Sequence, residues 1–254
     1  YMGTLRRSFL INPKGKIGKI YEKVKKIFHK NVSYACYLSN RINEKMNGKV
    51  IKTDTMKTVM WGVKPKKVVK KLNQNTFKIL FVGLIKPSQG IENIFSFLKT
   101  HKGYEIKVLG VCEQSFYTKL KKMIKNYKIE KQVYFPNAFL SDEDLEKESR
   151  DCNVGVALYD VSPLNATYYA DPGKVKSYAE MQLPIVMSNI SDITYYINKF
   201  NCGEVVKNVD GLESAFTKIK RNYKKYQDGL KKFNEYFYYE AYYKKSFSFL
   251  EKLW

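Results

Sequence analysis

The sequence predicts an α/β protein built around a doubly wound parallel sheet, and three observations support this prediction. From residue 77 onward, short apolar segments alternate with longer amphipathic ones, as expected for buried strands that helices cover on both faces. The 254 residues are 44% hydrophobic and 15% aromatic, which is enough to bury a core. No apolar run reaches the roughly 18 residues that a membrane-spanning helix requires.

The predicted strands are short and apolar. They occupy residues 78–82, 105–109, 132–135, 153–158, 185–187 and 204–206. The segments between and after them carry apolar residues at intervals of three or four, as on one face of an α-helix. These predicted helices occupy residues 90–99, 114–127, 141–149, 173–181, 190–200, 210–226 and 229–252. Six strands that alternate with helices in this way form a Rossmann-like domain.

Positive charge is concentrated in the first 75 residues. The chain has 46 Lys and Arg against 24 Asp and Glu, a net charge of +22, and residues 1–75 carry +16 of it. This asymmetry indicates that the chain has two parts. Only five of the basic residues are Arg, and Lys suits a diffuse electrostatic surface better than base-specific contacts. Nucleic-acid binding is therefore a remote alternative, and no nucleic-acid partner is expected.

The basic part also contains recognisable elements. Residues 16–30 have helical periodicity, and Lys covers the surface outside the apolar stripe. Such a helix either lies on an anionic membrane or packs its apolar face on its own sheet. A strand at 32–38, a helix at 40–46, a strand at 58–62 and a Lys-rich linker at 63–76 follow. The four Cys are far apart, without a close pair for zinc, and are expected to be reduced core thiols in a cytosolic protein.

Two loops are candidates for ligand binding, because doubly wound sheets bind ligands at the carboxyl ends of their strands. The first loop, residues 83–90, has Gly83 and Gly90 at its ends, which allow a tight turn and a close approach of the backbone to a ligand. The helix that begins at Gly90 leaves free N–H groups at this edge. The second loop, residues 159–173, leads into the next helix.

The second loop ends with Asp171, Pro172, Gly173 and Lys174, in that order. Asp171 is expected to be the N-cap residue and Pro172 the first helical residue. A helix N-terminus favours anions, so a Lys in the first turn works against the helix dipole. Lys174 is therefore a candidate for holding a bound diphosphate, and the alternative is a solvated surface Lys.

Several segments from residue 77 onward resemble, in order, the C-terminal domain of group 1 glycosyltransferases (glycosyltransferase family 4). The clearest are FKILFVGLIKPSQGIENIF at 77–95 and PGKVKSYAEMQLPIV at 172–186. The segments at 104–110, 129–158 and 201–219 also resemble this family at the normal spacing. The resemblance implies a GT-B fold of two Rossmann-like domains. It also implies metal-independent transfer, with retention, from a nucleotide-sugar donor bound by the C-terminal domain.

The resemblance also implies a division of the chain. Residues 1–62 would be a partial N-terminal, acceptor-side domain, 63–76 the linker and 77–228 the nucleotide-sugar-binding domain. Residues 229–254 would form a C-terminal helix that packs back toward the N-terminal part. The first strands of the acceptor-side domain have no counterpart, which suggests a missing N-terminal segment or a partner chain.

The resemblance assigns roles to positions that match the family pattern. Lys174 and Lys86 are the expected catalytic residues, Lys86 replacing an Arg that the family has where Leu84 stands. The expected nucleotide-binding residues are Gly83, Leu84, Gln89, Gly90, Pro172, Gly173, Ser177 and Glu180. Gln89 stands where the family has Lys, and Ser177 where it has the Glu that holds the ribose. Glu180 follows one turn later on the same helix face. No metal site and no cofactor besides the donor are expected.

The leading functional expectation is a glycosyltransferase that acts on a polysaccharide, glycolipid or glycoprotein acceptor. The net charge of residues 1–75 fits a cytoplasmic protein that lies peripherally on the inner face of an anionic membrane. The altered Arg and Glu positions leave a second hypothesis open. In it, the chain is a non-catalytic GT-B-like subunit that binds a nucleotide or a partner.

Overall fold

The computed structural model describes residues 34–51, 53, 56–66, 72, 76–162 and 164–248, and four positions nearer the N-terminus, residues 19, 20, 23 and 27. Most of the predicted basic helix at 16–30 and most of the linker at 63–76 lie outside the described residues. In the ranges just given, no helix is long and apolar enough to cross a membrane.

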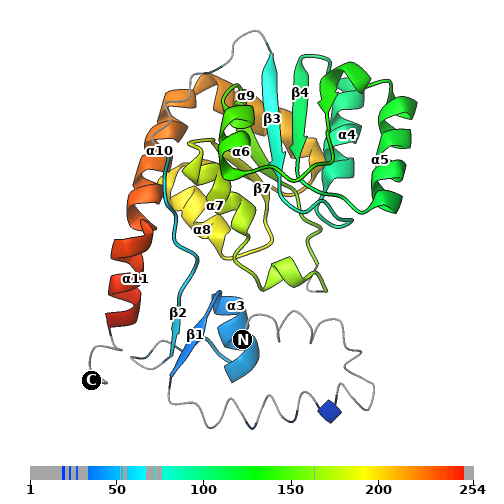
Figure 1. Cartoon of the computed structure of the whole chain (residues 1–254). Helices are drawn as coiled ribbons and strands as arrows, with labels where there is room; N and C mark the ends of the chain where they lie inside the picture. The colour runs from blue at the N-terminus through cyan, green and yellow to red at the C-terminus, as the bar shows by residue number, and fades with distance from the viewer. Residues whose placement is uncertain are drawn as a thin grey trace.

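The main sheet has six parallel strands in the order β5-β4-β3-β6-β7-β8 (Figure 1). The strands are β3 (Phe77–Val82), β4 (Tyr104–Leu109), β5 (Val133–Tyr134), β6 (Val154–Ala157), β7 (Ile185–Ser188) and β8 (Gly203–Val206). The chain runs outward from β3 to β5, returns to the middle at β6 and then continues in the other direction. The crevice between β3 and β6 is therefore the topological switch point, where sheets of this kind bind ligands. The predicted doubly wound, Rossmann-like fold is confirmed.

Helices cover both faces of this sheet, which explains why its central strands are buried on both sides. The helices are α4 (Ile91–Thr100), α5 (Gln114–Tyr127), α6 (Asp142–Ser149), α7 (Gly173–Glu180), α8 (Ile193–Phe200), α9 (Leu212–Arg221) and α10 (Tyr223–Tyr236). One apolar core joins α4, α5 and α9 to the sheet, and a second joins α7, α8 and α10 to it. The capping signal at residue 141 acts as predicted, because the Ser141 hydroxyl accepts the Asp144 N–H at the start of α6.

Tyr178 fixes α7 against the sheet. Its hydroxyl donates to the Val156 carbonyl oxygen at 2.7 Å and accepts the Val82 N–H at 3.2 Å. A side chain at Gly155 could not fit here, because its Cβ would lie 2.2 Å from the Tyr178 ring. The fully buried ring therefore holds α7 over β3 and β6, the two strands at the switch point.

The described N-terminal part is a small parallel pair, β1 (Ala35–Tyr37) and β2 (Met56–Thr58), with α3 (Asn40–Asn47) between them. The predicted bounds of the second strand, 58–62, are wrong, because the strand is Met56–Thr58 and, after the Val59 N–H donates to the Tyr37 carbonyl oxygen, residues 60–63 turn toward the C-terminal helices. The Val63 N–H donates to the Phe237 carbonyl oxygen, and the Tyr239 N–H donates to the Val63 carbonyl oxygen.

The C-terminal helices also differ from the prediction. The chain breaks at Asn222, between α9 and α10, and again before α11 (Tyr239–Phe247), rather than at 226–229. Gly229 lies inside α10. Only a glycine fits at this position, because a Cβ would lie 2.4 and 2.3 Å from the carbonyl oxygens of Phe200 and Asn201. This glycine allows close helix packing and does not end a helix. As Figure 1 shows, α11 extends beyond the main domain alongside β2. Among the cysteines, Cys36 is exposed, so the prediction of four core thiols is wrong for that residue.

Candidate functional site at the carboxyl edge of the sheet

The two loops that the sequence singles out meet at the switch point. The Asp160 N–H, after β6, donates to the Ser88 carbonyl oxygen, after β3, at 2.9 Å. Gly90 sits directly against the end of β6, because a Cβ there would lie 1.6 Å from the Leu158 carbonyl oxygen. Gly90 is therefore required by the packing of two backbone segments, as well as by its positive φ of 76°.

Lys174 reaches from the first turn of α7 over the ends of β3 and β6. Its Nζ donates to Oε1 of Gln89 at 3.1 Å. The same atom lies 3.7 Å from the centre of the Phe81 ring and 5.3 Å from that of Tyr159. The residue is half-buried, but its Nζ is turned inward onto these rings. The structure thus brings together Lys174 and Gln89, two of the predicted site residues.

The surroundings of Lys174 change the acidity of its amine. Burial lowers the pKa of Lys174 to about 7, because removing the ammonium group from water disfavours the charged form. In the described ranges, no carboxylate offsets this effect. An anion within hydrogen-bond distance of Nζ would favour the charged form and raise the pKa again. Lys174 is therefore well suited to an anionic ligand.

Two glycines, Gly173 directly before Lys174 and Gly83 directly after β3, have open space around them. Gly173 and Gly83 are exposed, and a Cβ added at either would meet no atom within 4 Å. Gly173 begins α7, so its N–H and that of Lys174 are among the first backbone donors of the helix and have no intrahelical acceptor. These donors, with the Lys174 amine, form an arrangement that can hold a phosphate group.

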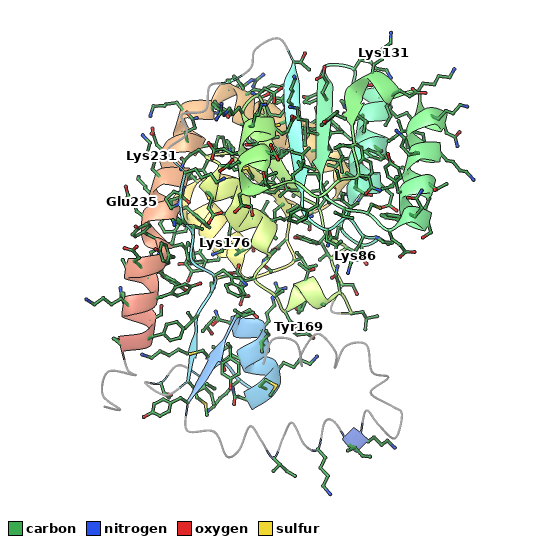
Figure 2. The ribbon with its side chains drawn as sticks, in the orientation of Figure 1. Lys86, Lys131, Tyr169, Lys176, Lys231 and Glu235 are labelled. Atoms are coloured by element: carbon green, nitrogen blue, oxygen red, sulfur yellow. The ribbon has the colours of Figure 1, made fainter. Side chains whose placement is uncertain are left out.

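Lys86 lies at the same edge of the sheet (Figure 2), and its side chain is exposed. Leu84 is also exposed, although an apolar side chain gains little from contact with a phosphate. Between them, Ile85 is buried and holds the loop through its N–H, which donates to the Val111 carbonyl oxygen at 2.9 Å. The loop therefore points both Leu84 and Lys86 outward.

Ser177 and Glu180 follow Lys174 on α7 but do not join its cluster. The Ser177 hydroxyl donates to the Gly173 carbonyl oxygen at 3.3 Å. The Glu180 carboxylate accepts the Lys64 N–H at 2.8 Å, and its backbone carbonyl oxygen accepts the Lys66 N–H. Burial raises the pKa of Glu180. Glu180 therefore fastens the chain after β2 to α7.

The start of α7 also differs from the prediction. Pro172 is the N-cap residue, so the expectation that Asp171 caps the helix is wrong. The Asp171 carboxylate instead accepts the Trp61 N–H at 2.6 Å and lies 3.5 Å from Lys176 Nζ. Both side chains are buried, and burial raises the pKa of Asp171 and lowers that of Lys176 to about 8. Lys176 Nζ also lies 3.6 Å from the Phe237 ring centre.

Sequence reasoning missed this buried pair and the aromatic wall around Lys174. The spacing of two residues between Lys174 and Lys176 places them on different sides of α7. This geometry explains why Lys174 faces the switch point, whereas Lys176 faces the C-terminal helices. In the part of the chain that the structure describes, no three His, Cys, Asp or Glu side chains gather as a metal ion would need.

The small N-terminal part is anchored to the loop before α7. The Ser39 hydroxyl donates to the Tyr169 carbonyl oxygen at 2.6 Å, and Arg41 donates to the Tyr168 carbonyl oxygen at 3.2 Å. The Arg41 guanidinium also lies 4.0 Å from the Tyr168 ring centre. Figure 2 shows Tyr169 between the main domain and α3. The loop that leads into α7, and so to Lys174, is therefore joined to the small N-terminal part.

No family model and no curated protein matches this sequence. Three solved structures resemble it at low identity. Sucrose-phosphate synthase from Thermosynechococcus elongatus has a TM-score of 0.72 and 15% identity over 92% of this chain and 62% of its own. The lipopolysaccharide outer core galactosyltransferase WaaB has a TM-score of 0.70 and 17% identity over 88% of this chain and 63% of its own.

The third structure is Anabaena HepE in complex with UDP and glucose, with a TM-score of 0.70 and 12% identity over 91% of this chain and 66% of its own. This chain thus spans just over three fifths of the length of the first two proteins. The chain therefore has the fold of GT-B glycosyltransferases over the part that it spans, including their Rossmann-like C-terminal domain.

Proposed function

We propose that this chain binds a nucleotide-sugar donor at the carboxyl edge of the main sheet and transfers its sugar. The observation that supports this most is the Lys174 amine, desolvated by Phe81 and Tyr159 beside the open N-terminus of α7. Glycosyl transfer releases a nucleoside diphosphate, whose negative charge must be stabilised as the bond to the sugar breaks. The amine and the α7 N–H groups supply that stabilisation without a metal ion.

In this proposal each site residue has a task. Lys174 stabilises the leaving diphosphate, Gln89 orients the Lys174 amine through its 3.1 Å hydrogen bond, and Lys86 adds a second cation from the neighbouring loop. Gly83 and Gly173 allow the phosphates to approach the backbone. Reaction at the anomeric carbon proceeds with retention.

The acceptor in this proposal is a polysaccharide, glycolipid or glycoprotein, bound on the side of the N-terminal part. The net charge of +16 in residues 1–75 supports a position on the inner, cytoplasmic face of an anionic membrane. A further N-terminal segment or a partner chain completes the acceptor side, since the chain spans 62% to 66% of the length of the similar structures.

A thermal-shift panel of UDP-, GDP- and ADP-sugars tests donor binding. A ligand at about 100 times its dissociation constant stabilises the folded state by about 2.7 kcal/mol, which is readily detected. We expect one nucleotide to raise the melting temperature and Lys174→Ala to abolish that increase. If none of the donors shifts the melting temperature, the proposal of a donor site is wrong.

Binding without turnover is the second candidate function, and two observations favour it. Leu84 supplies no charge at a position where group 1 glycosyltransferases have Arg. The Ser177 hydroxyl, at the position expected to hold the ribose, donates instead to the Gly173 carbonyl oxygen. A donor that stabilises the chain but is neither transferred nor hydrolysed, across several acceptors, would identify a regulatory or scaffolding subunit. Release of free sugar or of a glycosylated acceptor would exclude this candidate.

A further inference from the structure

The outer side of α5 presents a row of lysine side chains. Its inner side is apolar and packs into the core that α4 and the main sheet share. Figure 1 shows α5 at the right-hand margin of the main domain, outside α4. The lysines that lie on the exposed side, and that we call the α5 lysine face, are Lys121, Lys122 and Lys125, together with Lys128 at the C-cap position.

The protein itself does not neutralise the α5 lysine face. Residues 114–131 contain six Lys and a single acidic residue, Glu130. Glu92, on α4, forms an ion pair with Lys119 at 3.2 Å, and Glu113, just before α5, accepts a Ser hydroxyl. Among the residues that the structure describes, no carboxylate forms an ion pair with any of the four lysines of the face. Their positive charge is therefore available to a partner.

A second lysine-rich helix, α10, shows the contrasting arrangement. There Asp228 lies one turn from Lys224 and from Lys231, and its carboxylate is 2.5 and 3.8 Å from their amines. On α5, Lys121 and Lys125 stand four residues apart with no acidic residue between them. Like charges at this spacing repel each other and weaken a helix. An anionic partner along the α5 lysine face would relieve that repulsion.

The chemistry of the face fits a surface that carries many anionic groups. Lys has a compact charge on a flexible stem, and it does not select one bidentate acceptor as Arg does. Lys121 Nζ lies 5.9 Å from the Tyr117 ring centre, and Lys99 Nζ, at the end of α4, lies 5.1 Å from that of Tyr127. Lys and Tyr side chains with apolar stems and polar tips are typical of the headgroup level of a membrane.

The α5 lysine face lies across the main sheet from α7. The core that contains the inner side of α5 also contains α4 and α9, whereas α7, α8 and α10 belong to the second core. None of the contacts that Lys174 makes with Gln89, Phe81 and Tyr159 involves α5. A membrane against this face would therefore leave the switch point open to a nucleotide.

From these observations we propose that the α5 lysine face binds the surface of an anionic lipid bilayer. The amines contact lipid phosphates, and α5 lies along the surface without entering the hydrocarbon core. The inference goes beyond the proposed function, because it assigns a membrane contact to the nucleotide-binding domain. It requires neither a bound nucleotide nor the charge of residues 1–75.

The test is sedimentation of the whole chain with vesicles of two parts phosphatidylcholine to about one part phosphatidylglycerol, at low and at physiological salt. Vesicles of phosphatidylcholine alone measure binding that does not depend on charge. We expect binding to the anionic vesicles only, and weaker binding at the higher salt concentration. The combined variant Lys121→Gln, Lys122→Gln and Lys125→Gln should bind at least about tenfold more weakly, since each Lys at an anionic surface contributes a factor of about five.

The matched control removes the same charge from α10, which belongs to the other core. It combines Lys225→Gln, Lys231→Gln and Lys232→Gln, three lysines that are exposed in the wild-type chain. Both triple variants lose three of the 22 net positive charges, and Gln keeps a high helix propensity in both. We expect the control to bind the anionic vesicles nearly as well as the wild-type chain does. Melting temperatures verify that both variants remain folded.

Three outcomes would overturn the proposal. One is that the chain does not bind the anionic vesicles. Another is that the α10 variant loses as much binding as the α5 variant, which would indicate a general effect of the net charge. The last is that the α5 variant binds the vesicles as the wild-type chain does but loses binding to a duplex oligonucleotide, which would make nucleic acid the partner of this face.

A UDP thermal-shift measurement on the same proteins keeps this inference separate from the donor site. We expect UDP to stabilise the α5 variant as much as it stabilises the wild-type chain. A chain that binds UDP but not anionic vesicles would contradict only the membrane contact. A chain that binds the vesicles through α5 but binds no nucleotide would contradict only the proposed donor site.

Discussion

The proposed function rests on Lys174 because of what surrounds its amine. A Lys in the first turn of a helix opposes the helix dipole, and this pattern was visible in the sequence. The aromatic wall of Phe81 and Tyr159 was not visible, because it depends on β3 and β6 lying side by side. Sequence reasoning could therefore name the residue but could not predict its desolvation.

The lowered pKa of Lys174 predicts that UDP binding depends on pH and is accompanied by proton uptake. The free site has a pKa of about 7, and a bound diphosphate raises it, so UDP should bind more weakly as pH increases above 7. At about pH 8, UDP binding should take up nearly one proton. Calorimetry in two buffers with different ionisation enthalpies measures this uptake. Lys174→Arg, which stays charged, should show none, and equal uptake by both proteins would contradict this assignment.

Gly90 and Gly173 should respond differently to Ala. At Gly90 the new Cβ would lie 1.6 Å from the Leu158 carbonyl oxygen, at a positive φ, so Gly90→Ala should lower the free energy of unfolding by about 3 kcal/mol or more. At Gly173 the Cβ meets nothing, so Gly173→Ala should change stability by less than about 1 kcal/mol. Urea denaturation measures both. Similar losses in the two variants would contradict the described packing.

At the scale of the elements, the strands of the main sheet follow from the sequence because buried parallel strands are short and continuously apolar. Gly229 shows where this reasoning stops. The predicted helix at 229–252 begins at this residue, whereas Gly229 lies inside α10 and allows that helix to approach the end of α8. Residues 58–62 show the same limit, because an apolar segment does not reveal whether it pairs with a strand or packs on a helix.

The buried pair of Asp171 and Lys176 is an interaction between elements with a clear energetic signature. Lys176→Met should lower the free energy of unfolding by about 3–5 kcal/mol, because it leaves a buried carboxylate without a cation. Asp171→Asn combined with Lys176→Met should lower it much less, because neither charge remains. Denaturation of the two single variants and the double variant completes a mutant cycle. Additive losses would show that the two side chains do not interact.

At the scale of the whole molecule, the segment that follows β2 is fastened to the C-terminal helix α11. The Tyr242 and Tyr243 hydroxyls, on α11, accept the N–H groups of Met60 and Gly62. The family resemblance implied a C-terminal helix that packs back toward the N-terminal part. It could not show which residues make the contact, because 15% of the chain is aromatic and many Tyr residues are equivalent in pattern.

Removing both hydroxyls should loosen this connection. Tyr242→Phe with Tyr243→Phe should increase hydrogen exchange at the Met60 and Gly62 amides, since each lost hydrogen bond contributes about 1 kcal/mol. Amides of β3 should exchange as before. Tyr239→Phe is the control, because its hydroxyl bonds only to the adjacent Glu240 among the described residues. If Tyr239→Phe also increased exchange at the Met60 and Gly62 amides, the effect could not be assigned to the hydrogen bonds of the Tyr242 and Tyr243 hydroxyls.

The central claim is that a nucleoside diphosphate binds at the N-terminus of α7, on Lys174. A crystal structure of the chain with UDP tests this most directly. The account predicts phosphate oxygens within about 3.5 Å of Lys174 Nζ and of the Gly173 and Lys174 backbone N–H groups. UDP bound elsewhere on the chain, with α7 and Lys174 making no contact to its phosphates, would contradict it.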